Sequence, residues 1–126
     1  MSNNVLDLDI LRPDDKLIKI GGNKVNVGFL PLALTWEISD IQEELSKYTA
    51  KQIQSDQKIM KVVFNLAVKM CATFCGHQFP ELDEEWFQNN TTMGQIQSLV
   101  EPIKDALDSS MKGIEEYPGN PEAVGK

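Results

Sequence analysis

An apolar segment with the periodicity of a helix runs from about residue 50 to residue 76. Its main stripe consists of Met60, Val63, Phe64, Ala67, Met70, Cys71 and Phe74, and Ile59, Val62 and Leu66 widen it. A helix that is apolar over so much of its circumference is usually contacted from several sides. We therefore predict a central helix over residues 50–76 that ends at Gly76, with the other elements packed around it.

Two short segments that alternate between apolar and polar residues precede this helix. They span residues 16–20 and 24–29 and flank a Gly-Gly-Asn sequence. Glycine, and to a lesser degree asparagine, tolerates the positive φ of a tight turn, so we place a two-residue turn at Gly22–Asn23, which pairs Ile20 with Val25. An isolated hairpin is marginally stable, so its apolar face is expected to pack on the helices. The residues of that face are Ile18, Ile20, Val25, Val27 and Phe29.

Three more helices are expected from local signals. From about residue 32 to residue 48, apolar residues recur every three or four positions. Asp83 is a suitable N-cap for a short helix that ends at Asn89-Asn90, and acidic residues occupy its first turn. Thr92 and Gln95 have the spacing of a capping box, which opens a last long helix. Pro102 lies inside this helix and is expected to kink or divide it.

These elements predict a mainly α protein with a small N-terminal β-hairpin, an α+β fold in which the hairpin packs on a three- or four-helix bundle. We assign residues 1–15 to an N-terminal arm that is acidic and apolar but irregular. Residues 16–116 form a single helical domain with the hairpin at 16–30. Residues 117–126, rich in proline and glycine, are expected to form a flexible tail.

The charge of the chain argues against nucleic acid partners, and its hydropathy argues against a membrane span. The formal net charge is −7, whereas proteins that bind nucleic acid usually carry a basic excess. Lysines do gather between Lys47 and Lys69, which leaves a local basic face open, although such runs usually mark a solvated helix surface. No apolar run approaches the roughly 20 residues that a membrane span needs, and the N-terminus lacks the features of a secretory signal. We expect a cytoplasmic protein.

Motifs that support catalysis are scarce. Cys71, Cys75 and His77 offer three potential metal ligands, but a structural zinc site needs four, and both cysteines lie on the apolar stripe. We interpret the cysteines as core residues in a reducing compartment and expect no metal. The only histidine has no evident acidic partner, and no glycine-rich loop opens a helix. The sequence therefore predicts a protein that is not an enzyme, with no catalytic residues and no cofactor.

The order of these parts resembles a known family. Residues 6–13 read LDLDILRP and lead to the Gly-Gly hairpin, which is followed by FLPL at residues 29–32. After the long apolar helix come LDEEWFQNNT at residues 82–91 and an amphipathic helix. This pattern, over most of residues 5–114, is similar to that of the tail assembly chaperones of long-tailed bacteriophages, particularly those that infect Gram-positive hosts.

The resemblance implies a small helical protein with an N-terminal hairpin and no catalytic residues. It implies binding to the tape measure protein and to tail tube subunits, which the chaperone keeps soluble in the cytoplasm of the bacterial host during tail assembly. Such chaperones are absent from the mature virion, and many are also made in a longer, frameshifted form. Two other interpretations stay open: another phage structural adaptor, such as a neck or head–tail joining protein, or a helical regulatory protein that uses the lysines. Homo-oligomerisation also stays open.

Three aromatic residues are candidates for protein binding, because large aromatics supply much of the energy of protein interfaces. Trp36 lies two residues from both Leu34 and Ile38, so it projects away from the apolar seam that those residues define. Trp86 and Phe87 lie in the short acidic helix. For Trp86, packing between the hairpin and the helices is an equally good interpretation.

Overall fold

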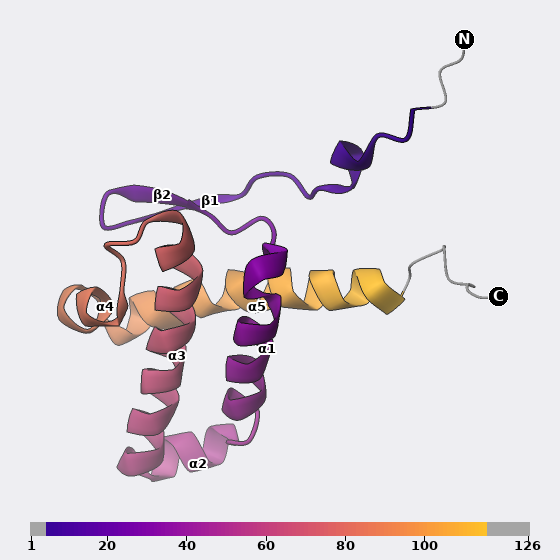
Figure 1. Ribbon diagram of the computed structural model, residues 1–126. Coiled ribbons are helices and arrows are strands. Elements are labelled where there is room, and N and C mark those ends of the chain that lie inside the picture. The colour runs from indigo at the N-terminus through magenta and orange to yellow at the C-terminus, as the bar shows by residue number, and fades with distance from the viewer. Residues whose placement is uncertain (1–4, 116–126) are drawn as a thin grey trace.

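The computed structural model of the chain describes residues 5–115, and it is mostly helical with one two-stranded antiparallel sheet near the N-terminus (Figure 1). This confirms the predicted fold class. In chain order the elements are a 3₁₀ turn at Leu8–Leu11, β1 at Leu17–Ile20, β2 at Asn23–Asn26, α1 at Leu32–Leu45, α2 at Ala50–Ser55, α3 at Gln57–Gln78, α4 at Glu84–Asn90 and α5 at Met93–Glu115.

The helix α3 occupies the centre of the fold. It runs antiparallel to α1, α2 joins the two at one end, the hairpin lies at the other end, and α5 crosses behind them (Figure 1). Each of the other four α-helices contacts α3. The C-terminal half of α3 is the more enclosed half, with Met70, Cys71 and Phe74 fully buried. The prediction of a central helix is confirmed for this half.

The first half of α3 is less enclosed than expected. Met60 and Phe64, which belong to the apolar stripe predicted to face the other elements, are only half-buried, whereas Ala67 is buried. By length and composition alone, α3 could cross a membrane, which corrects the expectation that no segment comes near that limit. In this fold, seven of its residues are buried inside the protein: Ala67, Val68, Met70, Cys71, Ala72, Phe74 and Cys75.

The segment predicted as one helix over residues 50–76 forms two helices, so the prediction of a single helix is wrong. The chain breaks at Asp56, which is extended, with φ −133°, and whose carboxylate accepts hydrogen bonds from the backbone N–H groups of Lys58 and Ile59. This is the N-cap of α3, a position that aspartate favours. The helix also continues past Gly76 to Gln78.

The hairpin turn lies one residue earlier than predicted. Gly21 and Gly22 form it, with φ of +57° and +80°. A two-residue turn of this kind needs positive φ at both positions, and two glycines meet that need better than glycine and asparagine. Val25 therefore pairs with Ile18, not with Ile20.

Most of the predicted apolar face of the hairpin is correct despite the misplaced turn. Moving the turn by one residue shifts the pairing register by two residues, and side chains alternate with a period of two, so the same residues stay together. Ile20, Val25 and Val27 are buried in the same core as the helices, and Ile18 packs against that core. Phe29, the fifth predicted member of the face, is half-buried and stacks on Arg12 instead.

The predicted N-terminal caps of α4 and α5 are confirmed. The Asp83 carboxylate accepts a hydrogen bond from the backbone N–H of Trp86 at 2.8 Å. Thr92 and Gln95 exchange the two hydrogen bonds of a capping box. The helix α5 is continuous through Pro102, which therefore does not divide it. The tail predicted for residues 117–126 lies outside the described residues.

The two turn glycines give a matched pair of substitutions. A Cβ on Gly21 would meet the indole ring of Trp86, whereas a Cβ on Gly22 would meet nothing within 4 Å. Gly22→Ala should lower the free energy of unfolding by about 1–2 kcal/mol through backbone strain alone. Gly21→Ala should introduce the same strain and also a clash with the indole, so it should lower the free energy of unfolding by about 2–5 kcal/mol. Denaturant unfolding measures both losses. Equal losses would show that the indole does not hold the turn.

Candidate protein-binding surfaces

The three aromatic candidates for protein binding differ in how far they are exposed to solvent. Trp36 is 63% exposed on α1, Trp86 is half-buried, and Phe87 is only 1% exposed. Trp86 and Phe87 pack edge to face, with ring centroids 5.0 Å apart. Of the three, only Trp36 presents its ring to solvent as a binding residue must.

The two aromatics of α4 hold the fold together. The ring of Trp86 lies directly against Gly21, so it closes the gap between the hairpin turn and α4, as the alternative interpretation held. The prediction of Phe87 as a surface contact needs correction, because this side chain is part of the core, as is Leu82 just before α4. The Asp83 cap fixes the start of this short helix and turns Phe87 inward.

Exposed apolar side chains gather in two neighbouring places. Seven of the ten large hydrophobic residues that are exposed within residues 5–112 lie in the N-terminal arm or at the start of α1. We call residues 5–11 the arm, and Leu32 with Trp36 the Trp36 surface. The arm stands away from the body of the protein (Figure 1). Its exposed residues are Val5, Leu6, Leu8, Ile10 and Leu11.

The base of the arm is anchored beside the start of α1. The guanidinium of Arg12 lies 4.3 Å from the centroid of the Phe29 ring, a cation–π contact. Phe29 precedes Leu32 by only three residues, so the arm leaves the body close to the Trp36 surface. Arg12 also lies 3.6 Å from the carboxylate of Asp15.

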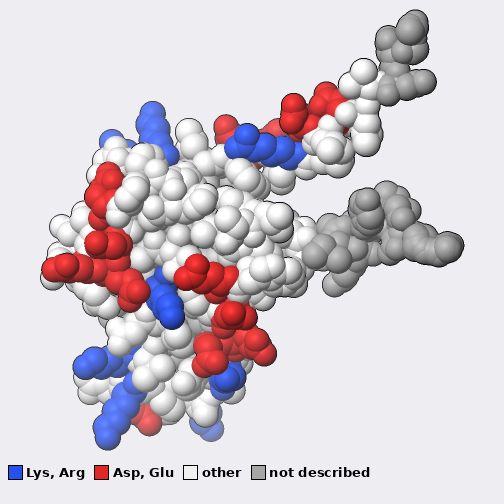
Figure 2. All heavy atoms as spheres, in the orientation of Figure 1, with Lys and Arg blue, Asp and Glu red and all other residues white. Residues whose placement is uncertain are grey.

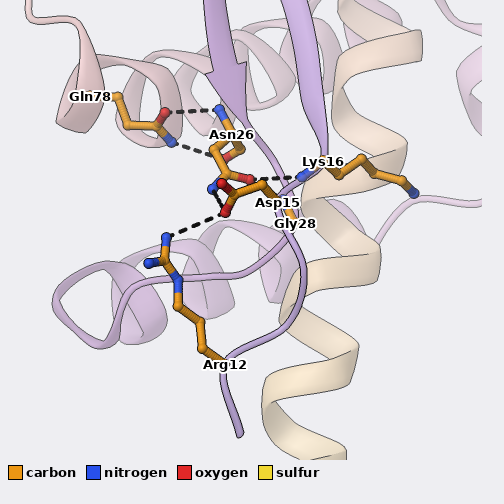
Figure 3. Close-up of polar contacts among 6 residues, drawn as sticks. All are labelled: Arg12, Asp15, Lys16, Asn26, Gly28 and Gln78. Carbon is orange, nitrogen blue, oxygen red and sulfur yellow. Dashed lines mark hydrogen bonds and ion pairs between the residues drawn. The ribbon is translucent and has the colours of Figure 1, made fainter. Parts of the chain in front are cut away.

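A polar network around Asn26 joins the segment between the arm and β1, the hairpin and α3 (Figure 3). The Asn26 Oδ1 atom accepts hydrogen bonds from the backbone N–H groups of Lys16 and Gly28, and its Nδ2 atom donates to Asp15 at 2.8 Å. The side-chain amide of Gln78 accepts from the backbone N–H of Asn26 and donates to its backbone carbonyl, both at 2.9 Å. Gln78 thus pairs with the outer edge of β2 as a neighbouring strand would. The sequence analysis missed this network, because Asn26 and Gln78 are 52 residues apart.

A groove of about 670 Å³ opens between the first half of α3, the ends of α1 and α2, and α5. Half-buried apolar side chains, among them Leu45, Val63 and Phe64, form part of its wall, and Glu101 and Lys104 are its charged residues. The Oε1 atom of Gln42, another lining residue, is buried and has no hydrogen-bond partner among the described residues. This volume lies within the range of about 300–1,000 Å³ typical of binding sites.

Charge is unevenly distributed over the surface. In Figure 2, basic side chains gather at the α2 end of the body, and acidic ones on α1 and near α4. The basic end carries Lys47, Lys51, Lys58 and Lys61. Of these, Lys47 forms an ion pair with Glu44 at 2.9 Å. One end of the protein, next to the groove, is thus locally basic although the whole chain is acidic.

The fold separates the three potential metal ligands Cys71, Cys75 and His77. Both thiols are buried, whereas His77 is exposed. Burial raises the pKa of Cys71, with a smaller contribution from the neighbouring Cys75, and burial raises the pKa of Cys75 to about 12. Within the described residues, no group of three His, Cys, Asp or Glu side chains is placed to hold a metal ion.

The buried thiols predict a loss of stability at high pH. Above the ordinary thiol pKa of 9.0, the unfolded chain releases the proton of Cys75, while the folded protein retains it up to about pH 12. The unfolded state then binds fewer protons, so the free energy of unfolding falls as the pH rises through this window, by up to about 1.4 kcal/mol per pH unit for one thiol. Cys75→Ala should show a shallower fall in urea unfolding between pH 9 and 11. Parallel curves for the two proteins would contradict this.

Trp36 and Phe87 should differ strongly in how much their substitution destabilises the protein. Trp36→Ala should change the free energy of unfolding by no more than about 0.5 kcal/mol, because the side chain lies at the surface. Phe87→Ala should lower it by about 3–5 kcal/mol, since it empties a buried site. Urea unfolding measures both. A large loss for Trp36→Ala would place that ring in the core.

Comparisons of this chain with protein-family profiles, with curated proteins and with solved structures find no match.

Proposed function

We propose that this chain is a non-enzymatic assembly chaperone of the phage tail type. It binds the tape measure protein and tail tube subunits and keeps them soluble during tail assembly, in the cytoplasm of the bacterial host. The resemblance in residues 5–114 supports the choice of client. The exposure of the Trp36 surface supports a binding role.

The Trp36 surface carries the proposal. Leu32 is 81% exposed and Trp36 is 63% exposed, and they lie one helical turn apart on the same side of α1. Two large apolar side chains in this arrangement match the spacing of apolar residues along a partner helix. A tryptophan left in water gains most from being covered, which is why tryptophan is frequent at interface centres.

Acidic residues beside the Trp36 surface suit this role. Glu37 and Asp40 are exposed on the same helix and keep the free protein soluble while the apolar pair is uncovered. They also favour a client whose apolar stripe is flanked by lysine or arginine, because opposite charges at the rim speed association. The client class that fits best is therefore an amphipathic helix with basic flanks.

The same features support a binder over an enzyme. The thiols of Cys71 and Cys75 are buried with raised pKa values, which makes them poor nucleophiles at neutral pH. The groove between α3 and α5 has one lysine and one glutamate among its lining residues and no histidine or cysteine. An apolar groove of this composition suits a peptide better than a reaction centre.

The test is co-expression with a phage tape measure protein. The unaltered chain should keep the client soluble, and Trp36→Ala should weaken binding of a client fragment by at least about tenfold, as expected for an interface tryptophan. Met93→Ala is the matched control, because Met93 is exposed and apolar but lies at the start of α5. Equal effects of the two substitutions would contradict the assigned surface.

Affinity capture from infected cells, followed by mass spectrometry, tests the client class itself. The chaperone proposal expects tape measure and tail tube proteins among the captured partners, and no copy of the chain in purified particles. Retention of the chain in finished particles would instead identify a structural adaptor.

A further inference from the structure

We infer that the arm of one molecule docks into the groove of a second copy of this chain. The groove is the one between α1, α2, α3 and α5, and the arm is residues 5–11. This self-association goes beyond the client binding proposed above and uses a different surface, since neither Leu32 nor Trp36 lines the groove.

The arm has the chemistry of a docking peptide. Its five large apolar side chains are between 61% and 84% exposed, although the body of the protein offers buried sites to most other residues of this kind. Part of the arm is already ordered as a 3₁₀ turn at Leu8–Leu11, with Asp7 as its N-cap. A preformed turn loses less conformational entropy on binding than an unstructured peptide would.

The groove offers a matching receptor. Its apolar side chains come from four helices and from the segment after α1, and they include Leu45, Tyr48, Ile53, Phe64 and Val100. Its buried Gln42 carbonyl oxygen has no donor within the described residues, and a backbone N–H of an inserted peptide is a suitable one. The volume of about 670 Å³ accommodates several aliphatic side chains but not a folded domain.

Charge selects this groove over the nearer Trp36 surface. The segment from Val5 to Asp15 carries four aspartates and one arginine, so it is acidic. The Trp36 surface has Glu37 and Asp40 beside it, which repel the arm. Lys104 and Glu101 balance one another in the groove lining, and the basic α2 end that adjoins the groove supplies the positive charge. Opposite charges around an apolar contact favour this pairing.

The arm is directed away from the groove of its own molecule. The Arg12–Phe29 stack and the Asp15–Asn26 hydrogen bond hold its base beside the hairpin. From there it runs outward, whereas the groove lies towards the α2 end, on the opposite side from the hairpin (Figure 1). A head-to-tail contact of this kind joins unlike surfaces, so it can link more than two molecules.

Sedimentation of the unaltered chain over a range of concentrations tests the inference. We expect concentration-dependent self-association, which the double substitution Leu8→Ser and Ile10→Ser weakens by at least about tenfold. Met93→Ser is the control, since it removes an exposed apolar side chain outside the arm and the groove. A chain that stays monomeric throughout, or an arm variant that associates as the unaltered chain does, overturns the inference.

Disulfide trapping locates the contact. A chain with Ile10→Cys, mixed with a chain with Ser46→Cys in oxidised glutathione, should form a covalent heterodimer. A partner chain with Lys24→Cys, whose cysteine lies on the hairpin, should form the covalent heterodimer at least about tenfold more slowly. The native thiols are buried and do not compete. Equal rates for the two partners overturn the inference, and so does a bridge that closes within one molecule when Ile10→Cys and Ser46→Cys share a chain. No client is present, so failure here leaves the proposed function standing.

Discussion

The C-terminal half of α3 is covered by helices on several sides, and the arrangement of the chain depends on this burial. Met70, Cys71, Phe74 and Cys75 have no exposed surface. Burial of such side chains contributes about 1.5–3 kcal/mol each for the larger ones, the main favourable contribution in a small domain. The hairpin is too small to be stable alone, and it is ordered because its apolar face joins the same core. The Gln78–Asn26 amide pair then fixes the hairpin to the end of α3.

The two halves of α3 differ in what covers them. The C-terminal half is enclosed, whereas the half that begins at the Asp56 cap leaves Val63 and Phe64 half-buried at the wall of a groove. The core is therefore complete at the hairpin end and open towards α2. The apolar arm and the Trp36 surface lie at the opposite end from α2. Exposed apolar surface of this kind is typical of binding sites, and it is the basis of the binding role that we propose.

Local signals were sufficient for much of the fold. The Asp83 cap and the Thr92–Gln95 capping box depend on residues within one turn of each other, so they could be predicted from the sequence. The apolar face of the hairpin was predicted correctly although the turn was misplaced, because a two-residue shift in register preserves the face. The break at Asp56 was missed since the apolar period continues through it, although aspartate followed by a helical pattern was a usable signal.

Exposure was decided by the tertiary structure. Trp86 and Phe87 are adjacent in an acidic helix, and nothing local shows that one closes the hairpin turn while the other fills the core. Trp36 was predicted to point away from its helix seam, but only the packed structure shows that no element within the described residues covers it. The sequence by itself determined most of the helices, the Asp83 and Thr92 caps and the faces of the strands, because these depend on neighbouring residues. The groove, the anchored arm and the Gln78–Asn26 contact depend on segments far apart in the chain, so they exist only once the helices have packed.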